Sequence, residues 1–198
     1  MKVIDILKND SWVRKYDFYP DFLESDYFNL LIDTYETLNE DILFKSKVHG
    51  KDHIERVIFY TLVLSFAYKL DYDDTNILRD AASLHDTRRV NDGWDIDHGR
   101  RAAEESIKYA KTKKEDQDIL KAVITAHSTN DKHMEDIIKE FVKDQSQRPR
   151  ALKLAKLFKD SDGLDRVRIN RLDPAYLRND YSLGLVDFAY EFYENFWK

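Results

Sequence analysis

Cysteine is absent from this 198-residue sequence, and glycine and proline are scarce, with five and three residues. Without cysteine the chain has no disulfide, no thiolate metal ligand and no cysteine nucleophile. A β-sandwich or β-barrel needs many tight turns, and so few glycines and prolines supply few of them. Since no segment shows a convincing strand alternation either, we predict an all-α fold.

An excess of basic residues and a long apolar run are also missing. The formal net charge is −6, whereas proteins that bind nucleic acid or anionic membranes carry a basic stripe, so we expect neither partner. The longest apolar run, VIFYTLVLSFAY at 57–68, is too short to span a bilayer and predicts a buried helix. The first residues, MKVIDILKNDSW, do not resemble a secretory signal. We therefore expect a cytoplasmic protein.

The organisation of the chain is uniform. It has no internal repeat, low-complexity tract or proline-rich linker, so we expect one domain over residues 1–198. The segment KDQSQRPR at 143–150 is predicted to be a loop. The aromatic-rich ends are expected to pack on the central helices, although FAYEFYENFW at 188–197 could also cover a partner chain in a homo-oligomer. Apolar spacing predicts helices near 20–43, 51–70, 75–86, 98–111, 115–128, 135–143, 150–169 and 184–197.

Three of the six histidines fall at the inward-facing ends of predicted helices. His85 continues the apolar stripe of residues 77–82, and His127 continues that of residues 120–124. His53 lies at the start of the most apolar helix. Because all three are at helix ends that face the core, they can converge on one pocket.

An aspartate also occupies an inward-facing helical position, in ALKLAKLFKDSDGLDRVRI, residues 151–169. Positions 151, 155, 158 and 162 share one helical face, which turns Asp162 toward the core, whereas Asp160 points elsewhere. An inward carboxylate is costly unless it is paired or bound to a cation. Asp165 is also near this face, and Arg166 could pair with either Asp162 or Asp165.

Each of these residues has an ordinary structural interpretation as well. A histidine on an apolar face is often a hydrogen-bonded core residue, and an inward aspartate is often half of an ion pair between helices. Their combination favours a metal site. Imidazole and carboxylate ligands without thiolate suit Mn²⁺, Fe²⁺, Co²⁺ or Ni²⁺ in octahedral geometry.

The same residues carry a family resemblance. The order H…HD…H…H…D resembles the HD superfamily of metal-dependent phosphohydrolases, whose fold is all-α. The resemblance covers about residues 47–170 and implies a helical-bundle HD domain with extra N- and C-terminal helices. Its pieces are HGKDHIERV (49–57), SLHDTRRVND (83–92), DHGRRAA (97–103), ITAHS (124–128) and FKDSDGLDRVR (158–168).

What the resemblance implies for the metal is a set of divalent-ion ligands. Members with two ions have additional histidines at the positions of His98 and His127, and Asp86 then bridges the ions. Other members bind one ion, so one and two ions both stay open. The four ligands implied for the first ion are His53, His85, Asp86 and Asp162.

Residues beside these ligands are candidates for substrate contact and catalysis. His49 belongs to an H-G-x-x-H variant of the first motif that occurs in a group of bacterial members. It is expected to donate to a substrate phosphate or to support a ligand, or else to contact backbone at the helix start. His133, among polar neighbours, is expected to be exposed. Asp52 or Asp131 could aid proton transfer.

Arginine and lysine near the ligands would meet the negative charge of a phosphate, since the guanidinium fork matches phosphate oxygens. Their alternative role is ordinary ion pairing with Asp92, Asp95 or Asp165. Arg88 and Arg89 are the leading candidates, and Lys159, Arg166 and Arg56 follow. We assign catalytic roles to Asp86, Arg89, His49 and Lys159, and substrate binding to Arg88, Arg89 and Arg166.

The resulting hypothesis is a metal-dependent phosphohydrolase that cleaves a small phosphate ester, such as a nucleotide or a related monoester or diester, with metal-activated water. Two alternatives remain. One is a di-iron oxygenase on the same fold, and the other is a non-catalytic nucleotide-binding regulatory domain, against which the complete ligand set argues.

Overall fold

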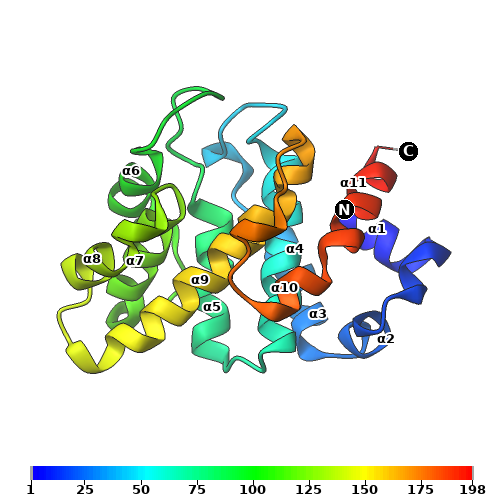
Figure 1. The fold of residues 1–198 in the computed structure, drawn as a ribbon, viewed down its shortest axis with the longest axis horizontal. Coiled ribbons are helices and arrows are strands. Elements are labelled where there is room, and N and C mark those ends of the chain that lie inside the picture. Colours follow the sequence, from blue (N-terminus) through cyan, green and yellow to red (C-terminus); the bar gives the residue numbers. More distant parts are fainter. Residues whose placement is uncertain (1, 198) are drawn as a thin grey trace.

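The computed structural model describes residues 2–197, and within them the chain is helical with no β-strand (Figure 1). The predicted all-α fold is confirmed. The α-helices are α1 (Lys2–Asn9), α2 (Phe18–Leu23), α3 (Asp26–Glu36), α4 (Lys51–Ala67), α5 (Tyr72–Leu84), α6 (His98–Glu105), α7 (Gln117–His127), α8 (Met134–Phe141), α9 (Arg148–Leu164), α10 (Asp180–Gly184) and α11 (Val186–Phe196). Short 3₁₀ helices are η1 (Ser11–Lys15), η2 (Glu40–Ile42), η3 (Ile107–Tyr109), η4 (Lys114–Asp116), η5 (Asp131–His133), η6 (Gln145–Gln147), η7 (Asp165–Ile169) and η8 (Pro174–Tyr176).

The centre of the molecule is formed by α4, α5, α7 and α9, which contact one another (Figure 1). Helices α6 and α8 pack on α7 at one end, while α1, α3 and α11 gather near α4 at the other. Helix α4 is buried continuously from His53 to Ser65, so the predicted buried helix is confirmed. Because it is covered on all sides, α4 can place a residue from its first turn deep inside the protein.

The aromatic ends pack on this centre, as predicted. The Phe188 and Phe192 rings of α11 lie 5.6 and 5.1 Å from the Phe59 ring of α4. Trp12 covers Phe188 from the other side, with the ring centroids 5.6 Å apart. Each fully buried phenylalanine contributes roughly 2–3 kcal/mol of transfer free energy. The buried face of α11 therefore covers the core of its own chain.

Several predicted helices are shorter than expected because local signals end them. The predicted helix 20–43 breaks at Ser25, whose extended backbone (φ −87°, ψ 159°) caps α3. The predicted helix 150–169 becomes η7 after Leu164 and ends at Asn170, which is left-handed at φ 53°. The predicted helices 98–111 and 184–197 are likewise divided, into α6 with η3 and α10 with α11. Helix α1 was not among the predicted segments.

The predicted loop at 143–150 is too long by its last three residues. Helix α9 already begins at Arg148, with Pro149 in its first turn, where proline's missing N–H costs nothing.

Among residues 2–197, no helix is both long and apolar enough to cross a lipid bilayer.

Candidate metal centre

Six side chains that the sequence singled out as metal ligands meet at one place, although they come from five different segments. His53 is in the first turn of α4, and His85 and Asp86 directly follow α5. His98 begins α6, His127 ends α7, and Asp162 lies near the end of α9. All of these positions are at or near helix ends, as the apolar stripes predicted for His85, His127 and Asp162.

Gly99 allows the start of α6 to approach the end of α7 closely. A Cβ atom at this position would lie 2.6 Å from Ser128 Oγ and 2.7 Å from the carbonyl oxygen of Ile124, which are distances that real Cβ atoms do not show. This close approach places His98 Nε2 2.9 Å from His127 Nε2. The glycine of the DHG stretch is therefore a packing requirement of the centre.

Asp86 lies between two pairs of histidines. Its Oδ2 is 3.4 Å from His53 Nε2 and 3.7 Å from His85 Nε2. Its Oδ1 is 3.0 Å from His98 Nε2 and 3.9 Å from His127 Nε2. The side chains thus form two groups that share Asp86, namely His53, His85 and Asp86, and Asp86, His98 and His127. Each group could hold a metal ion.

Asp162 lies beside the first of these two groups. Its Oδ1 lies 3.5 Å from His53 Nε2. With Asp162, two carboxylates are near the first pair of histidines, whereas the second pair has only the shared Asp86. More negative charge around the first group favours a cation there.

The tautomers of these histidines follow from their hydrogen bonds. The Nδ1 of His85 is 3.0 Å from the Ala82 carbonyl oxygen, and that of His127 is 2.5 Å from the Ile124 carbonyl oxygen. His98 Nδ1 contacts the Asp95 carbonyl oxygen in the same way. A carbonyl oxygen only accepts, so Nδ1 must carry the proton in each case. The Nε2 lone pairs are then directed into the centre, as in metal-bound histidines.

The spacing of these nitrogens fits metal ligands better than hydrogen-bond partners. The Nδ1 of His53 donates to the Asp165 carboxylate, so its Nε2 carries no proton either. His53 Nε2 and His85 Nε2 are 3.1 Å apart, yet two nitrogens without protons cannot hydrogen-bond. With metal–nitrogen bonds of about 2.1 Å, two ligands at right angles are about 3 Å apart. In addition, Asp86 Oδ2 is buried and has no hydrogen-bond partner among the described residues. A divalent cation would satisfy all of these atoms.

The protonation states also suit a metal. Burial lowers the pKa of His85 to about 3 and lowers the pKa of His127, so both are neutral at pH 7. Burial acts to raise the pKa of Asp86, but the surrounding histidines, His85 first among them, hold that pKa well below its ordinary value, so Asp86 is ionised. Neutral imidazoles around an ionised carboxylate are the forms that bind metal.

Asp165 holds His53 in place. Its Oδ2 accepts a hydrogen bond from His53 Nδ1 at 2.7 Å, and its Oδ1 accepts one from Arg56 Nε at 2.5 Å. The Arg56 guanidinium lies over the Phe196 ring at 4.6 Å. Arg56 is therefore an internal partner of Asp165 and not the phosphate ligand considered from the sequence. Arg56 and His53 are three residues apart on one helix, a spacing that brings both to the same partner.

Arg166, which could have paired with Asp162 or Asp165, pairs with neither. Asp165 has Arg56 and Arg168 as its cationic partners, with Arg168 Nη1 3.5 Å from Asp165 Oδ2. Arg166 is exposed and lines a cavity beside the centre.

Two adjacent arginines after the HD pair point in different directions. Arg89 Nη1 is 3.4 Å from Asp86 Oδ1 and almost equally far from both ring nitrogens of His98, at 3.1 and 3.2 Å. Because these two distances are almost equal, Arg89 Nη1 lies over the face of the His98 imidazole and not in line with the lone pair of either ring nitrogen. Arg88 instead donates to Glu105 Oε2 at 2.8 Å. The substrate-binding role of Arg88 stays a prediction, and in this structure its guanidinium is paired with a partly exposed carboxylate.

The other predicted residues surround the centre at a greater distance. His49 Nδ1 is 2.9 Å from Asp92 Oδ1, and burial lowers the pKa of His49. Its ring is perpendicular to that of His53, with the ring centroids 5.9 Å apart. This contact with a carboxylate replaces the backbone contact considered from the sequence. His133 is exposed, as predicted.

Lys159 is fully engaged in structural contacts. Its Nζ donates to the carbonyl oxygens of Ala126 and Thr129 at 3.0 and 2.5 Å, and it lies 2.9 Å from Asp131 Oδ1. These three acceptors match the three N–H donors of the ammonium group, and the catalytic role of Lys159 stays a prediction. Asp131 also pairs with Arg178, and its pKa of about 2 makes it a weak base for proton transfer.

A cavity of about 660 Å³ opens beside the centre, with His127 and Asp162 in its wall. Arg166 and Arg171 line it, and neither has an ion pair among the described residues. Trp94 and Tyr176 stand at the same cavity with 90% and 68% of their surface exposed. The sequence analysis missed Arg171, Trp94 and Tyr176, because all three lie outside the α-helices and show no periodicity.

Comparisons with known proteins add no assignment. No family model, no curated protein and no solved structure matches the chain. What is known of the centre therefore comes from its own geometry.

Proposed function

We propose that the protein is a metal-dependent phosphohydrolase of the HD type that cleaves a small phosphate ester. The observation that carries this proposal is the position of Asp86, whose two oxygens each face one pair of histidines. Such an arrangement suits one ion or two ions bridged by the carboxylate. The order of the ligands along the chain, H…HD…H…H…D, supports the same family.

The donor set indicates which metals are suitable. Imidazole nitrogens and carboxylate oxygens without any thiolate favour Mn²⁺, Fe²⁺, Co²⁺ or Ni²⁺. The first group, with Asp162 as a second carboxylate, should bind its ion more tightly than the second group. The positive charge of Arg89, 3.4 Å from Asp86 Oδ1, further weakens cation binding to the second group.

A divalent ion at this centre supplies Lewis acidity and makes water a better nucleophile near neutral pH. The protein's own residues bind and orient the substrate. Arg166 and Arg171 offer guanidinium groups to phosphate oxygens at the cavity wall. Trp94 and Tyr176 offer aromatic faces to the organic part of the ester, which supports a nucleotide. Asp165 keeps the Nδ1 proton on His53 and so directs its Nε2 to the centre.

The test combines elemental analysis of the purified protein with a panel of phosphate esters assayed in Mn²⁺, Co²⁺, Ni²⁺ and Fe²⁺. We expect bound metal and hydrolysis in the wild type and neither in Asp86→Ala. Loss of several kcal/mol of transition-state stabilisation corresponds to at least about 10³-fold in rate. The matched control is His133→Ala, which removes an exposed histidine and should leave metal content unchanged.

The proposal is wrong if Asp86→Ala keeps the metal content and the hydrolysis of the wild type. Oxygen uptake by the iron-loaded protein without ester hydrolysis would favour the di-iron oxygenase instead. Metal binding without either reaction would favour a regulatory domain.

A further inference from the structure

A second cavity, of about 980 Å³, lies between α3, α5 and the segment that precedes α7. It shares no lining residue with the cavity beside the metal centre. Its volume is in the range of sites that bind small organic molecules. Leu30 and Leu70 contribute apolar surface to it, and Arg79 contributes a charge.

Arg79 is a buried cation with few partners. Only 4% of its surface is exposed. Among the described residues, its guanidinium makes one hydrogen bond, from Nη1 to Asp33 Oδ2 at 3.3 Å. A guanidinium has five N–H donors, and buried charges are ordinarily paired and hydrogen-bonded. Most of the hydrogen-bonding capacity of Arg79 is therefore left for a molecule in the cavity.

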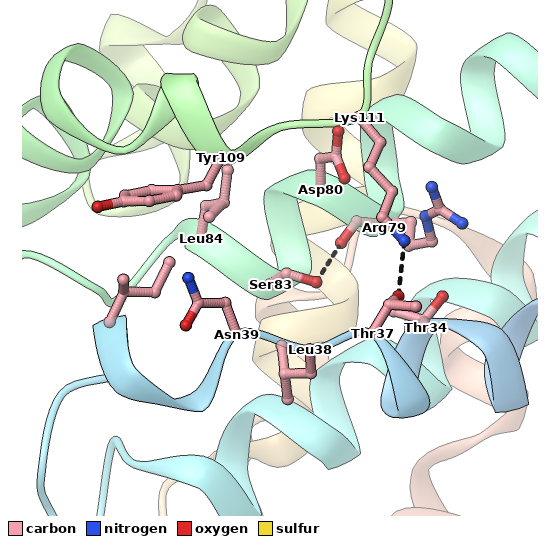
Figure 2. Close-up of a pocket in the computed structure, with 11 residues that line it drawn as sticks. Thr34, Thr37, Leu38, Asn39, Arg79, Asp80, Ser83, Leu84, Tyr109 and Lys111 are labelled. Atoms are coloured by element: carbon pink, nitrogen blue, oxygen red, sulfur yellow. Dashed lines mark hydrogen bonds between the residues drawn. The ribbon is translucent and has the colours of Figure 1, made fainter.

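Lys111 places a second positive charge near Arg79 (Figure 2). Its Nζ lies 3.9 Å from Asp33 Oδ2 and donates to Thr37 Oγ1 at 2.6 Å. Two cations thus share one carboxylate, which is half exposed. Both Arg79 and Lys111 also line the small adjoining pocket drawn in Figure 2. Asp80, which also lines that pocket, accepts hydrogen bonds from the backbone N–H and the hydroxyl of Thr112 and has no ion pair with either cation among the described residues. The unused donors of Arg79 and Lys111 therefore suit an anionic group.

The remaining acidic residues of the cavity do not pair with Arg79 or Lys111. Asp73 is 2.6 Å from Lys113, and Asp116 is 2.6 Å from Arg150, so both carboxylates are neutralised by their own partners. Asp26 lines the cavity seven residues before Asp33 on α3, about 10 Å along the helix axis.

Two further polar groups in the wall lack partners. Thr75 and Asn76 precede Arg79 by four and three residues, so all three share one face of α5. Thr75 Oγ1 and Asn76 Oδ1 are buried with no hydrogen-bond partner among residues 2–197. Buried polar atoms without a partner are rare in proteins, and each of them calls for an explanation.

We propose that this cavity is a second binding site, for a small molecule with an oxyanion group and an apolar body. Arg79 binds the oxyanion through its guanidinium fork, and Lys111 contributes a second positive charge. Leu30 and Leu70 contact the apolar body. Asp33 competes with the ligand for the same two cations. Carboxylates, sulfonates and phosphates share this chemistry.

The probe for the test is benzenesulfonate, which combines an oxyanion with an aromatic ring and is a weak metal ligand. Its binding is followed by ¹⁵N–¹H chemical shifts of the full chain. We expect saturable shifts at Asn76, Arg79 and Thr112, and none with benzyl alcohol, which lacks the charge. Parallel titrations with benzoate and phenylphosphonate show whether a carboxylate or a phosphate is preferred.

Two substitutions in the Arg79–Asp33 ion pair should have opposite effects on probe binding if Arg79 binds the ligand. If the ion pair has only a structural role, neither substitution should change binding in this way. Arg79→Gln should weaken benzenesulfonate binding at least about tenfold, because a charge-assisted bidentate contact is lost. Asp33→Asn should tighten it several-fold, because the competing carboxylate is removed. The matched control is Arg100→Gln, which removes a partly exposed arginine from its pair with Glu140, outside this cavity, and should change nothing.

The proposal is overturned if no shifts occur in this cavity up to the solubility limit of the probe, or if Arg79→Gln binds like the wild type. Weaker binding in Asp33→Asn would also contradict it. If Arg79→Gln does not fold, Lys111→Gln replaces it, since Lys111 is about half exposed and its loss should still weaken binding.

Discussion

Asp160 and Asp86 are both almost completely buried, at 0% and 2% exposure, but their surroundings differ. Asp160 accepts hydrogen bonds from the backbone N–H groups of Arg178 and Asn179 and from both of their side chains, all between 2.7 and 3.0 Å. Asp86 faces histidine nitrogens on both sides, and its Oδ2 has no hydrogen-bond partner among the described residues.

This difference separates a structural carboxylate from a ligand. A buried charge is tolerated when its lone pairs are satisfied, and the chain itself satisfies those of Asp160. In doing so it ties the segment after η8 to α9. Asp86 is left with lone pairs that nothing in residues 2–197 fills, so a cation is the partner that completes it.

The largest effect on stability is therefore expected at Asp160. Asp160→Ala removes the buried acceptor of two backbone N–H groups and of the Arg178 and Asn179 side chains, although Arg178 keeps its pair with Asp131, and should lower the free energy of unfolding by about 3–5 kcal/mol. Urea denaturation of the metal-free protein measures this loss. The control is Asp86→Ala under the same conditions, which should cost much less. If Asp86→Ala lowered the free energy of unfolding more than Asp160→Ala, Asp86 and not Asp160 would be the structural carboxylate.

A substitution at Asp165 tests whether a carboxylate whose oxygens already accept hydrogen bonds within the protein contributes to metal affinity. Asp165→Asn weakens the partner of His53 Nδ1, and a change of this kind typically lowers metal affinity by about 10–100-fold. Competition with a chelator measures the Mn²⁺ affinity, and circular dichroism shows that the variant is folded. Asp92→Asn is the matched control, because Asp92 also bonds a histidine Nδ1, that of His49, which is not a metal ligand. Equal losses in the two variants would contradict the prediction.

The smallest effect is expected at Asp131, a half-exposed carboxylate paired with Arg178 and Lys159. Partial burial opposes ionisation, but the hydrogen bonds from these two cations lower the pKa of Asp131 to about 2. Because the folded pKa is below the unfolded value of about 3.9, the stabilisation is fully present above about pH 4 and is lost as the pH falls toward 2. Half-exposed pairs contribute about 1 kcal/mol or less.

Denaturation of Asp131→Asn and the wild type over this pH range measures the effect. The difference between the two proteins should be constant from pH 7 to about pH 4 and should shrink below it. A difference that stays the same down to pH 3 would show that the ion pairs contribute nothing.

Much of the centre was predictable because helical periodicity decides which face a residue occupies. The stripes that end in His85 and His127 lead inward, and the spacing of residues 151–162 turns Asp162 and not Asp160 toward the histidines. Asp160 is nevertheless buried, because segment 178–179 covers it. The periodicity predicted its direction but not its partner.

Sequence alone thus determined the helical fold and the inward direction of the ligands, since both depend on spacing within a single helix. The tertiary structure decided the rest. It turned Arg89 toward Asp86 and Arg88 toward Glu105, engaged Lys159 with the end of α7, and paired Arg56 with Asp165 across 109 residues. These choices depend on how separate helices pack, because turn conformation and long-range pairing have no periodic signal in the chain.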